Sequence, residues 1–79
     1  MKNIKDLAVS AETVCARYRA GRMERETVRE WVLGLGAYPP PHGDRIREAV
    51  EWFRTHASDT VSEEIRVVDL DRLSAISAP

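Results

Sequence analysis

Apolar residues recur every three or four positions over most of the chain, which is the spacing of one face of an α-helix. The first run begins at Ile4 and ends before Gly21, a residue type that readily takes the left-handed conformation that terminates helices. This run predicts a helix over about residues 4–20, or one that starts at Ala11 behind Ser10 as its cap. Its apolar positions are Ile4, Leu7, Ala8, Ala11, Val14, Cys15 and Tyr18.

A second apolar stripe follows after two or three residues and predicts a helix over about residues 24–35. Its members are Val28, Trp31, Val32 and Leu35. Glu24 is the candidate N-cap, which gives Met23 and Val28 the spacing of a hydrophobic staple. Because the connection is so short, we expect the first two helices to be neighbours in a helical hairpin.

A proline-rich segment separates this hairpin from the second half of the chain. Gly34 and Gly36 end the second helix, and the prolines that follow cannot continue it. Residues 36–43 are therefore predicted to be a rigid connector rather than a polyproline ligand. The next stripe predicts a third helix over about residues 44–57, with Asp44 as its N-cap. Its members are Ile46, Ala49, Val50, Phe53 and Ala57.

The C-terminal segment, residues 60–77, has two competing interpretations. Thr60 and Glu63 have the spacing of a capping box, which favours a fourth helix with a break at residues 69–71, where the stripe changes sides. The β-branched run at residues 64–70 would otherwise be a strand, whose mate would have to come from another chain. We therefore predict an all-α fold: one small domain, residues 1–79, formed by a compact bundle of three to four short helices with an irregular helical or strand-like end.

Composition and charge change this picture little. The chain is 43% hydrophobic and 32% charged, with a formal net charge of −1, whereas nucleic-acid modules carry a clear positive excess. Residues 1–30 hold seven Lys or Arg against five Asp or Glu, and residues 58–79 hold two against five. With a single cysteine and no long apolar run, we expect a cytoplasmic protein without a membrane partner.

No residue pattern predicts catalysis or a cofactor. Cys15 lies on an apolar stripe, as a core cysteine does. His42 lies in the connector and His56 near the end of the third predicted helix, and no pair of these residues has the spacing of zinc ligands. Asp69 and Asp71 lack the glycine and the later glutamate of a calcium loop. We therefore expect that the protein is not an enzyme and that it binds neither a metal ion nor a small-molecule cofactor.

Residues 3–8, NIKDLA, followed by residues 9–14, VSAETV, resemble the opening of helix-turn-helix repressors of the lactose-repressor type. In that family a first helix of the IKDLA kind leads through a glycine turn to a VS-x-x-TV recognition helix. The turn and its glycine are absent here, so Ala8 runs directly into Val9 and the first helix and the turn cannot both form. No DNA-reading residue is carried over from the resemblance.

Two regions are candidates for binding a partner. The segment RYRAGRMERETVREW contains five arginines, of which Arg22, Arg25 and Arg29 could line one surface for phosphate or acidic protein groups. The interleaved glutamates could equally pair with them on a solvated surface. Trp52 lies roughly 100° from the centre of its stripe, one turn before His56, and tryptophan is enriched among interface hot spots.

We therefore expect a small non-catalytic protein–protein interaction module that acts through a helical surface on a partner or on itself. Small regulators and inhibitors encoded by phages and other mobile elements are proteins of this kind. Apolar residues outside the stripes, such as Val9, Trp52 and Val67, favour this hypothesis. The alternative is a small DNA-binding transcriptional regulator that uses the Arg17–Arg29 region as a dimer.

Overall fold

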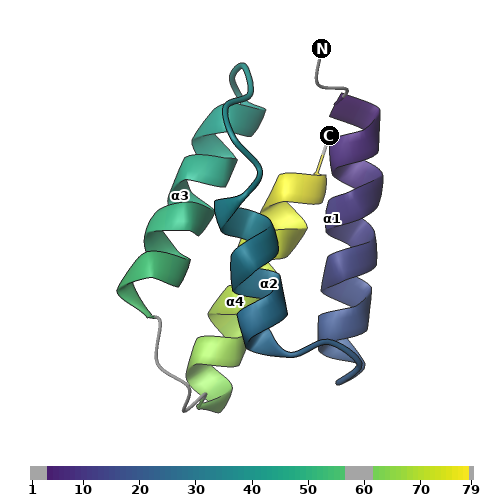
Figure 1. Cartoon of the computed structure of the whole chain (residues 1–79), viewed down its shortest axis with the longest axis vertical. Coiled ribbons are helices and arrows are strands. Elements are labelled where there is room, and N and C mark those ends of the chain that lie inside the picture. The colour runs from purple at the N-terminus through teal and green to yellow at the C-terminus, as the bar shows by residue number, and fades with distance from the viewer. Residues whose placement is uncertain (1–3, 57–61, 79) are drawn as a thin grey trace.

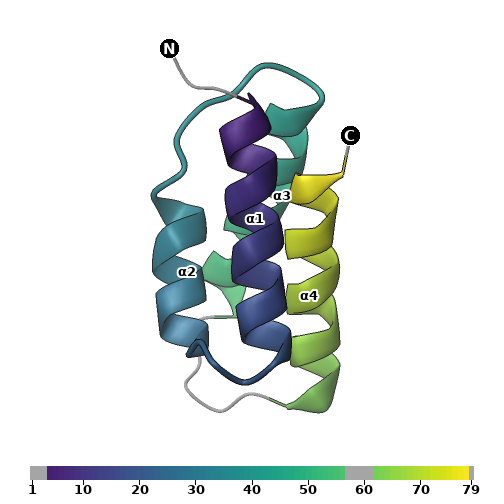
Figure 2. The ribbon, with the colours of Figure 1, turned by 90° about the vertical axis from the view of Figure 1, so that its right-hand side faces the viewer.

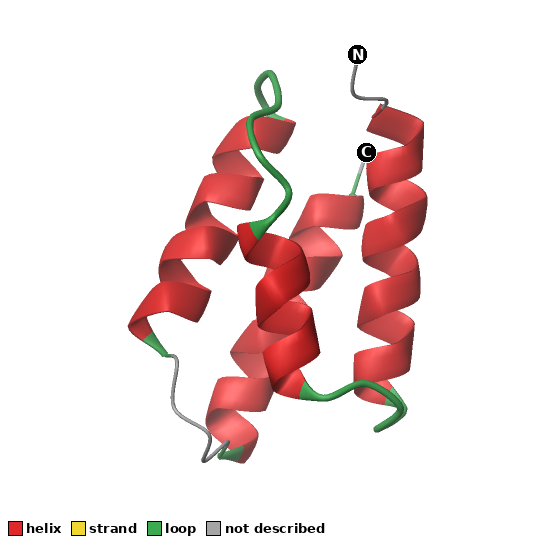
Figure 3. Ribbon diagram, in the orientation of Figure 1, coloured by secondary structure: helices red, strands yellow, loops and turns green. Residues whose placement is uncertain are grey.

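A computed structural model of the chain describes residues 4–56 and 62–78 and shows an up-down-up-down bundle. Its helices are α1 (Ile4–Arg19), α2 (Arg25–Leu33), α3 (His42–Thr55) and α4 (Glu63–Ser77). Helices α1 and α3 lie diagonally opposite each other across the bundle, as do α2 and α4 (Figure 1, Figure 2). Each helix packs against the next, and α4 closes the bundle with an extensive contact against α1. The described residues contain no strand (Figure 3), so the predicted all-α bundle is confirmed.

Helix α1 is uninterrupted, which excludes a start behind Ser10 and leaves no room for the turn of a helix-turn-helix. Gly21 ends it as expected, with φ at +75°. The Gly21 amide donates to the Tyr18 carbonyl at 3.1 Å and the Arg22 amide to the Arg17 carbonyl at 2.8 Å. These two bonds form a Schellman motif, which satisfies carbonyls that the helix itself leaves free.

Helix α2 begins after Glu24, the predicted N-cap, although the glutamate side chain makes no capping hydrogen bond. The helix ends at Leu33 with Gly34 as its C-cap, two residues earlier than predicted. The connector therefore covers residues 34–41 rather than 36–43.

Helix α3 begins at His42, two residues before the predicted start, and its N-cap is Pro41 rather than Asp44. Proline suits the start of a helix, because its φ is already restrained and the amide proton that it lacks has no partner there. Asp44 lies instead in the first turn, where its charge complements the helix dipole. Ala57, predicted on the stripe of this helix, lies outside the described residues.

Helix α4 is continuous, so the alternative strand is excluded and the predicted break at residues 69–71 is wrong. Its N-cap is Ser62, whose Oγ accepts from the Ile65 amide at 3.2 Å. Thr60, of the predicted capping box, lies outside the described residues. The apolar stripe of α4 looks interrupted only when Asp69 is assigned to the surface. In the structure the Asp69 side chain is buried. The inward-facing stripe runs from the half-buried Ile65 through the buried Asp69, Leu73 and Ile76.

The core takes apolar side chains from every helix. Trp31 and Trp52 are partly buried against it, and Cys15 lies within it as predicted. None of the described helices combines the length and apolar content that a membrane span requires. The buried apolar residues are Leu7, Ala11, Val14, Cys15, Tyr18, Val28, Val32, Ile46, Ala49, Phe53, Leu73 and Ile76.

Candidate functional site

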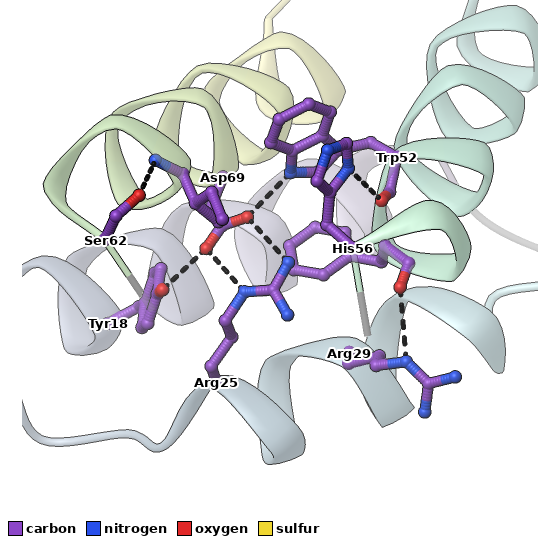
Figure 4. Close-up of polar contacts among 9 residues, drawn as sticks. Tyr18, Arg25, Arg29, Trp52, His56, Ser62 and Asp69 are labelled. Atoms are coloured by element: carbon purple, nitrogen blue, oxygen red, sulfur yellow. Dashed lines mark hydrogen bonds and ion pairs between the residues drawn. The ribbon is translucent and has the colours of Figure 1, made fainter. Parts of the chain in front are cut away.

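Asp69 belongs to α4, and its carboxylate is fully buried among the four helices. It accepts hydrogen bonds from a side chain of each of α1, α2 and α3 (Figure 4). From α1, the Tyr18 hydroxyl donates to Oδ2 at 2.6 Å. From α2, Arg25 donates through Nε to Oδ2 at 2.8 Å and through Nη2 to Oδ1 at 3.2 Å. From α3, the Trp52 indole N–H donates to Oδ1 at 2.7 Å. A carboxylate has about four acceptor positions, so this cluster (the Asp69 cluster) satisfies it completely.

The Asp69 cluster holds a charge pair that is almost entirely removed from water. The Arg25 side chain is 9% exposed, and its guanidinium carbon lies 4.9 Å from the centroid of the Phe53 ring. Burial, together with the hydrogen bond and the charge of Asp69, raises the pKa of Tyr18 well above its ordinary value of about 10. Tyr18 therefore stays protonated and remains a donor.

Trp52 connects this cluster to the surface. While its N–H bonds inward to Asp69, its ring forms part of the wall of an open groove of about 370 Å³. The residues that line this α3–α4 groove are Glu48, Glu51, Trp52, Thr55, His56 and Arg72. Two neighbours pack on the indole: the His56 ring, with its centroid at 3.8 Å, and the Arg72 guanidinium at 5.9 Å.

His56 is held at the end of α3 by its own backbone and by the carbonyl one turn earlier. Its amide donates to the Trp52 carbonyl at 3.0 Å, and its Nδ1 lies 3.2 Å from the same oxygen. The expected position of this histidine at a helix C-terminus is therefore observed. Trp52 is held by a hydrogen bond on its inner edge and by the tilted His56 ring packed against it, so the groove has an aromatic wall fixed by two contacts.

The five residues predicted to bind a partner fall into separate places. Trp52 and His56 come together in the α3–α4 groove. Arg25 is turned into the bundle, and Arg29 donates to the Phe53 carbonyl at 3.2 Å and lies 3.7 Å from Glu26. Arg22 is exposed beyond the end of α1. Arg22, Arg25 and Arg29 therefore do not assemble into one basic surface.

Arg29 is one of three arginines that bond to the C-terminal end of a neighbouring helix. The carbonyl groups there lack donors within their own helix and carry the negative end of the helix dipole. A guanidinium supplies both a hydrogen-bond donor and a positive charge. These half-buried arginines therefore link neighbouring helices. The donor–acceptor pairs are Arg66 Nη2 to Tyr18 at 2.9 Å, Arg29 Nε to Phe53 at 3.2 Å and Arg45 Nη1 to Ala78 at 2.8 Å.

The sequence interpretation missed Asp69, although a local signal for it exists. Asp69 occupies the position between Ile65 and Leu73 at which the α4 stripe requires a buried residue. A charged residue on a buried stripe indicates a partner of opposite charge inside the fold. The identity of that partner has no local signal, because Arg25 lies 44 positions away.

Other reactive side chains lie apart from this site. The Cys15 thiol is buried, with its sulfur 4.0 Å from the Leu70 carbonyl oxygen and 3.6 Å from the Arg19 guanidinium. His42, expected in the connector, is the half-buried first residue of α3. Within residues 4–56 and 62–78, no group of three or more His, Cys, Asp or Glu side chains is placed to hold a metal ion.

A second, smaller groove of about 270 Å³ lies on the other edge of α3, beside the connector. Its lining is mainly apolar and includes Tyr38, Ile46 and Val50, with Arg47 at its margin. None of the residues that line this second groove belongs to the Asp69 cluster, whereas Trp52 belongs to both the cluster and the α3–α4 groove.

The α3–α4 groove and the Asp69 carboxylate share Trp52, which links the surface of the bundle to its interior. No protein-family model, no curated protein and no solved structure matches this chain.

Proposed function

We propose that this protein is a small, non-catalytic cytoplasmic regulator or inhibitor that binds a protein partner in the α3–α4 groove. The observation that supports the proposal is the fixed Trp52 wall. An interface tryptophan supplies a large contact area, and one that is already ordered loses little conformational freedom on binding. Trp52 is ordered before any partner arrives, because Asp69 and His56 hold its edge and its face.

The shape of the groove fits this role. The groove is open to the solvent, and a volume of about 370 Å³ can accept an anchoring side chain from a partner. Val9 and Val67, the other apolar residues outside the stripes, are 63% and 57% exposed on α1 and α4. Single exposed valines are ordinary on a protein surface, so the groove is the stronger candidate.

Site-specific photo-crosslinking in the native host tests the proposal with a matched pair of positions. Thr55 is an exposed residue that lines the groove, and Thr27 is also an exposed threonine but lies on α2, outside the groove. A photoreactive amino acid at position 55 should give a crosslinked adduct with a second protein, and one at position 27 should not. Equal adducts from both positions, or none from position 55, would contradict the proposal. An adduct of twice the chain mass would identify the partner as a second copy.

Binding to random duplex DNA separates this proposal from the DNA-binding hypothesis. The duplex should show no retention by the protein at low salt, because two of the three candidate arginines are engaged inside the bundle. Retention that falls steeply as salt rises would instead favour the DNA-binding regulator.

A further inference from the structure

We infer that the α3–α4 groove accepts a basic segment of a partner protein, with a lysine or arginine side chain next to an apolar one. This inference rests on the proposed function and adds the chemistry of the partner. Two observations support it: acidic and basic residues lie on different edges of α3, and Arg72 of α4 is already paired with Asp71.

The acidic and basic residues of α3 lie on different edges of the helix. Glu48 and Glu51 line the α3–α4 groove, and both are exposed. Arg47 lines the groove on the opposite edge and pairs there with Asp44 at 3.7 Å. Neither groove glutamate forms an ion pair within the described residues, so two carboxylates face the groove without a counter-ion from the described part of the bundle.

Among the described lining residues, Arg72 has one edge of its guanidinium engaged by Asp71, although its buried Nε has no hydrogen-bond partner. Arg72 bonds to Asp71 at 3.3 Å, and its guanidinium lies 5.9 Å from the centroid of the Trp52 ring. Its charge is therefore offset by a neighbour on its own helix, and the charge left over in the groove is negative. A cationic side chain of a partner would complement Glu48 and Glu51, whereas an anionic one would be repelled.

The other half of the recognition is apolar. Within the described residues, Arg72 is the one lining residue of the groove from α4, so its apolar lining comes from α3. On the facing helix, Trp52 supplies the aromatic wall. A partner segment would therefore place an apolar side chain against Trp52 and a basic one towards the glutamates.

Selection of random short peptides displayed on phage, with the full chain as bait, tests this inference without knowledge of the partner. We expect the enriched peptides to carry lysine or arginine together with an apolar residue. A labelled synthetic copy of such a peptide is then titrated against the protein by fluorescence anisotropy. E48K/E51K should weaken its binding at least tenfold, because it converts two attractive contacts into repulsive ones. E48Q/E51Q should weaken it roughly 2- to 30-fold, the range that two rim ion pairs supply.

E12K/E30K is the matched control, since it makes the same change in net charge at exposed glutamates of α1 and α2 outside the groove. It should leave the affinity within about twofold. Equal weakening by E12K/E30K, enrichment of neutral or acidic peptides, or no enrichment would overturn the inference. A dimer of the chain that E48K/E51K dissociates would place a second copy in the groove and would overturn it as well. An adduct at position 55 combined with acidic peptides would refute the basic partner alone and leave the proposed function standing.

Discussion

Replacing Asp69 by asparagine tests whether one buried carboxylate holds the four helices together. D69N keeps the size and shape of the side chain but removes its charge from a fully buried position. Each carboxylate oxygen accepts from two donors, so the asparagine NH₂ group, which takes the place of one oxygen, must face two donors. Arg25, only 9% exposed, also loses its counter-ion.

The expected loss is large relative to the stability of a chain of this size. Removing one partner of a buried ion pair costs about 3–5 kcal/mol, because the remaining charge stays desolvated. A domain of 79 residues has a free energy of unfolding of roughly 4–12 kcal/mol, at about 0.05–0.15 kcal/mol per residue. D69N should therefore unfold at a midpoint lower by at least about 12 °C, since each 1 kcal/mol corresponds to about 4–8 °C in a domain of this size.

Urea and thermal unfolding followed by far-UV circular dichroism measure the effect, and D71N is the control. Asp71 lies on the same helix two positions further on, is 72% exposed and pairs only with Arg72 among the described residues. Its replacement should change the free energy of unfolding by no more than about 0.5 kcal/mol. If the D69N midpoint lies within about 4 °C of the D71N midpoint, the Asp69 cluster does not stabilise the bundle as we argue.

Three further predictions concern the interior. Combining Arg25→Met with Asp69→Leu should recover much of the loss that either single change causes, because no unpaired charge remains; simple additivity in a double-mutant cycle would contradict this. Because the pKa of Tyr18 is raised in the folded protein, the unfolded chain releases this proton first above about pH 10, so stability should fall as pH rises from about 10 to about 12. Tyr18→Phe should flatten that fall in urea midpoints, and an unchanged slope would argue against it. Gly43→Ala should cost about 1–3 kcal/mol in thermal unfolding, because a Cβ there would overlap the backbone carbonyl of Tyr38; an unchanged midpoint would show that the connector can shift.

The sequence predicts the helices well where apolar stripes are regular. The ends of α1 and α2 lie within about two residues of the prediction, because glycine marks each of them. The start of α3 also differs by two residues from the prediction, since a proline can begin a helix as well as interrupt one. Helix α4 is predicted least well, because Asp69 occupies a buried position of its stripe and makes the apolar pattern look broken.

The candidate site is predictable only in part, because some of its residues have a local signal in the sequence and others do not. Trp52 and His56 can be singled out because a tryptophan off its stripe is unusual and the two are one turn apart. The Asp69 cluster brings together residues 17, 44 and 51 positions from Asp69. Local patterns cannot select which of several arginines reaches such a carboxylate, since that depends on how the helices pack. Arg25 therefore looks like a surface residue in the sequence and is an interior one in the fold.

Trp52 belongs to both the Asp69 cluster and the α3–α4 groove, so stability and binding depend on one side chain. Trp52→Ala would remove the wall of the groove and would also deprive Asp69 of a donor while opening a gap at the edge of the core. A loss of partner binding in that variant could come from either change. Glu48, Glu51 and Thr55 line the same groove from exposed positions, so variants of these residues alter the binding surface while the cluster stays intact. If the groove binds a partner, that dependence also runs in reverse: a partner that packs on Trp52 selects the conformation in which Asp69 is fully bonded, and so stabilises the whole bundle.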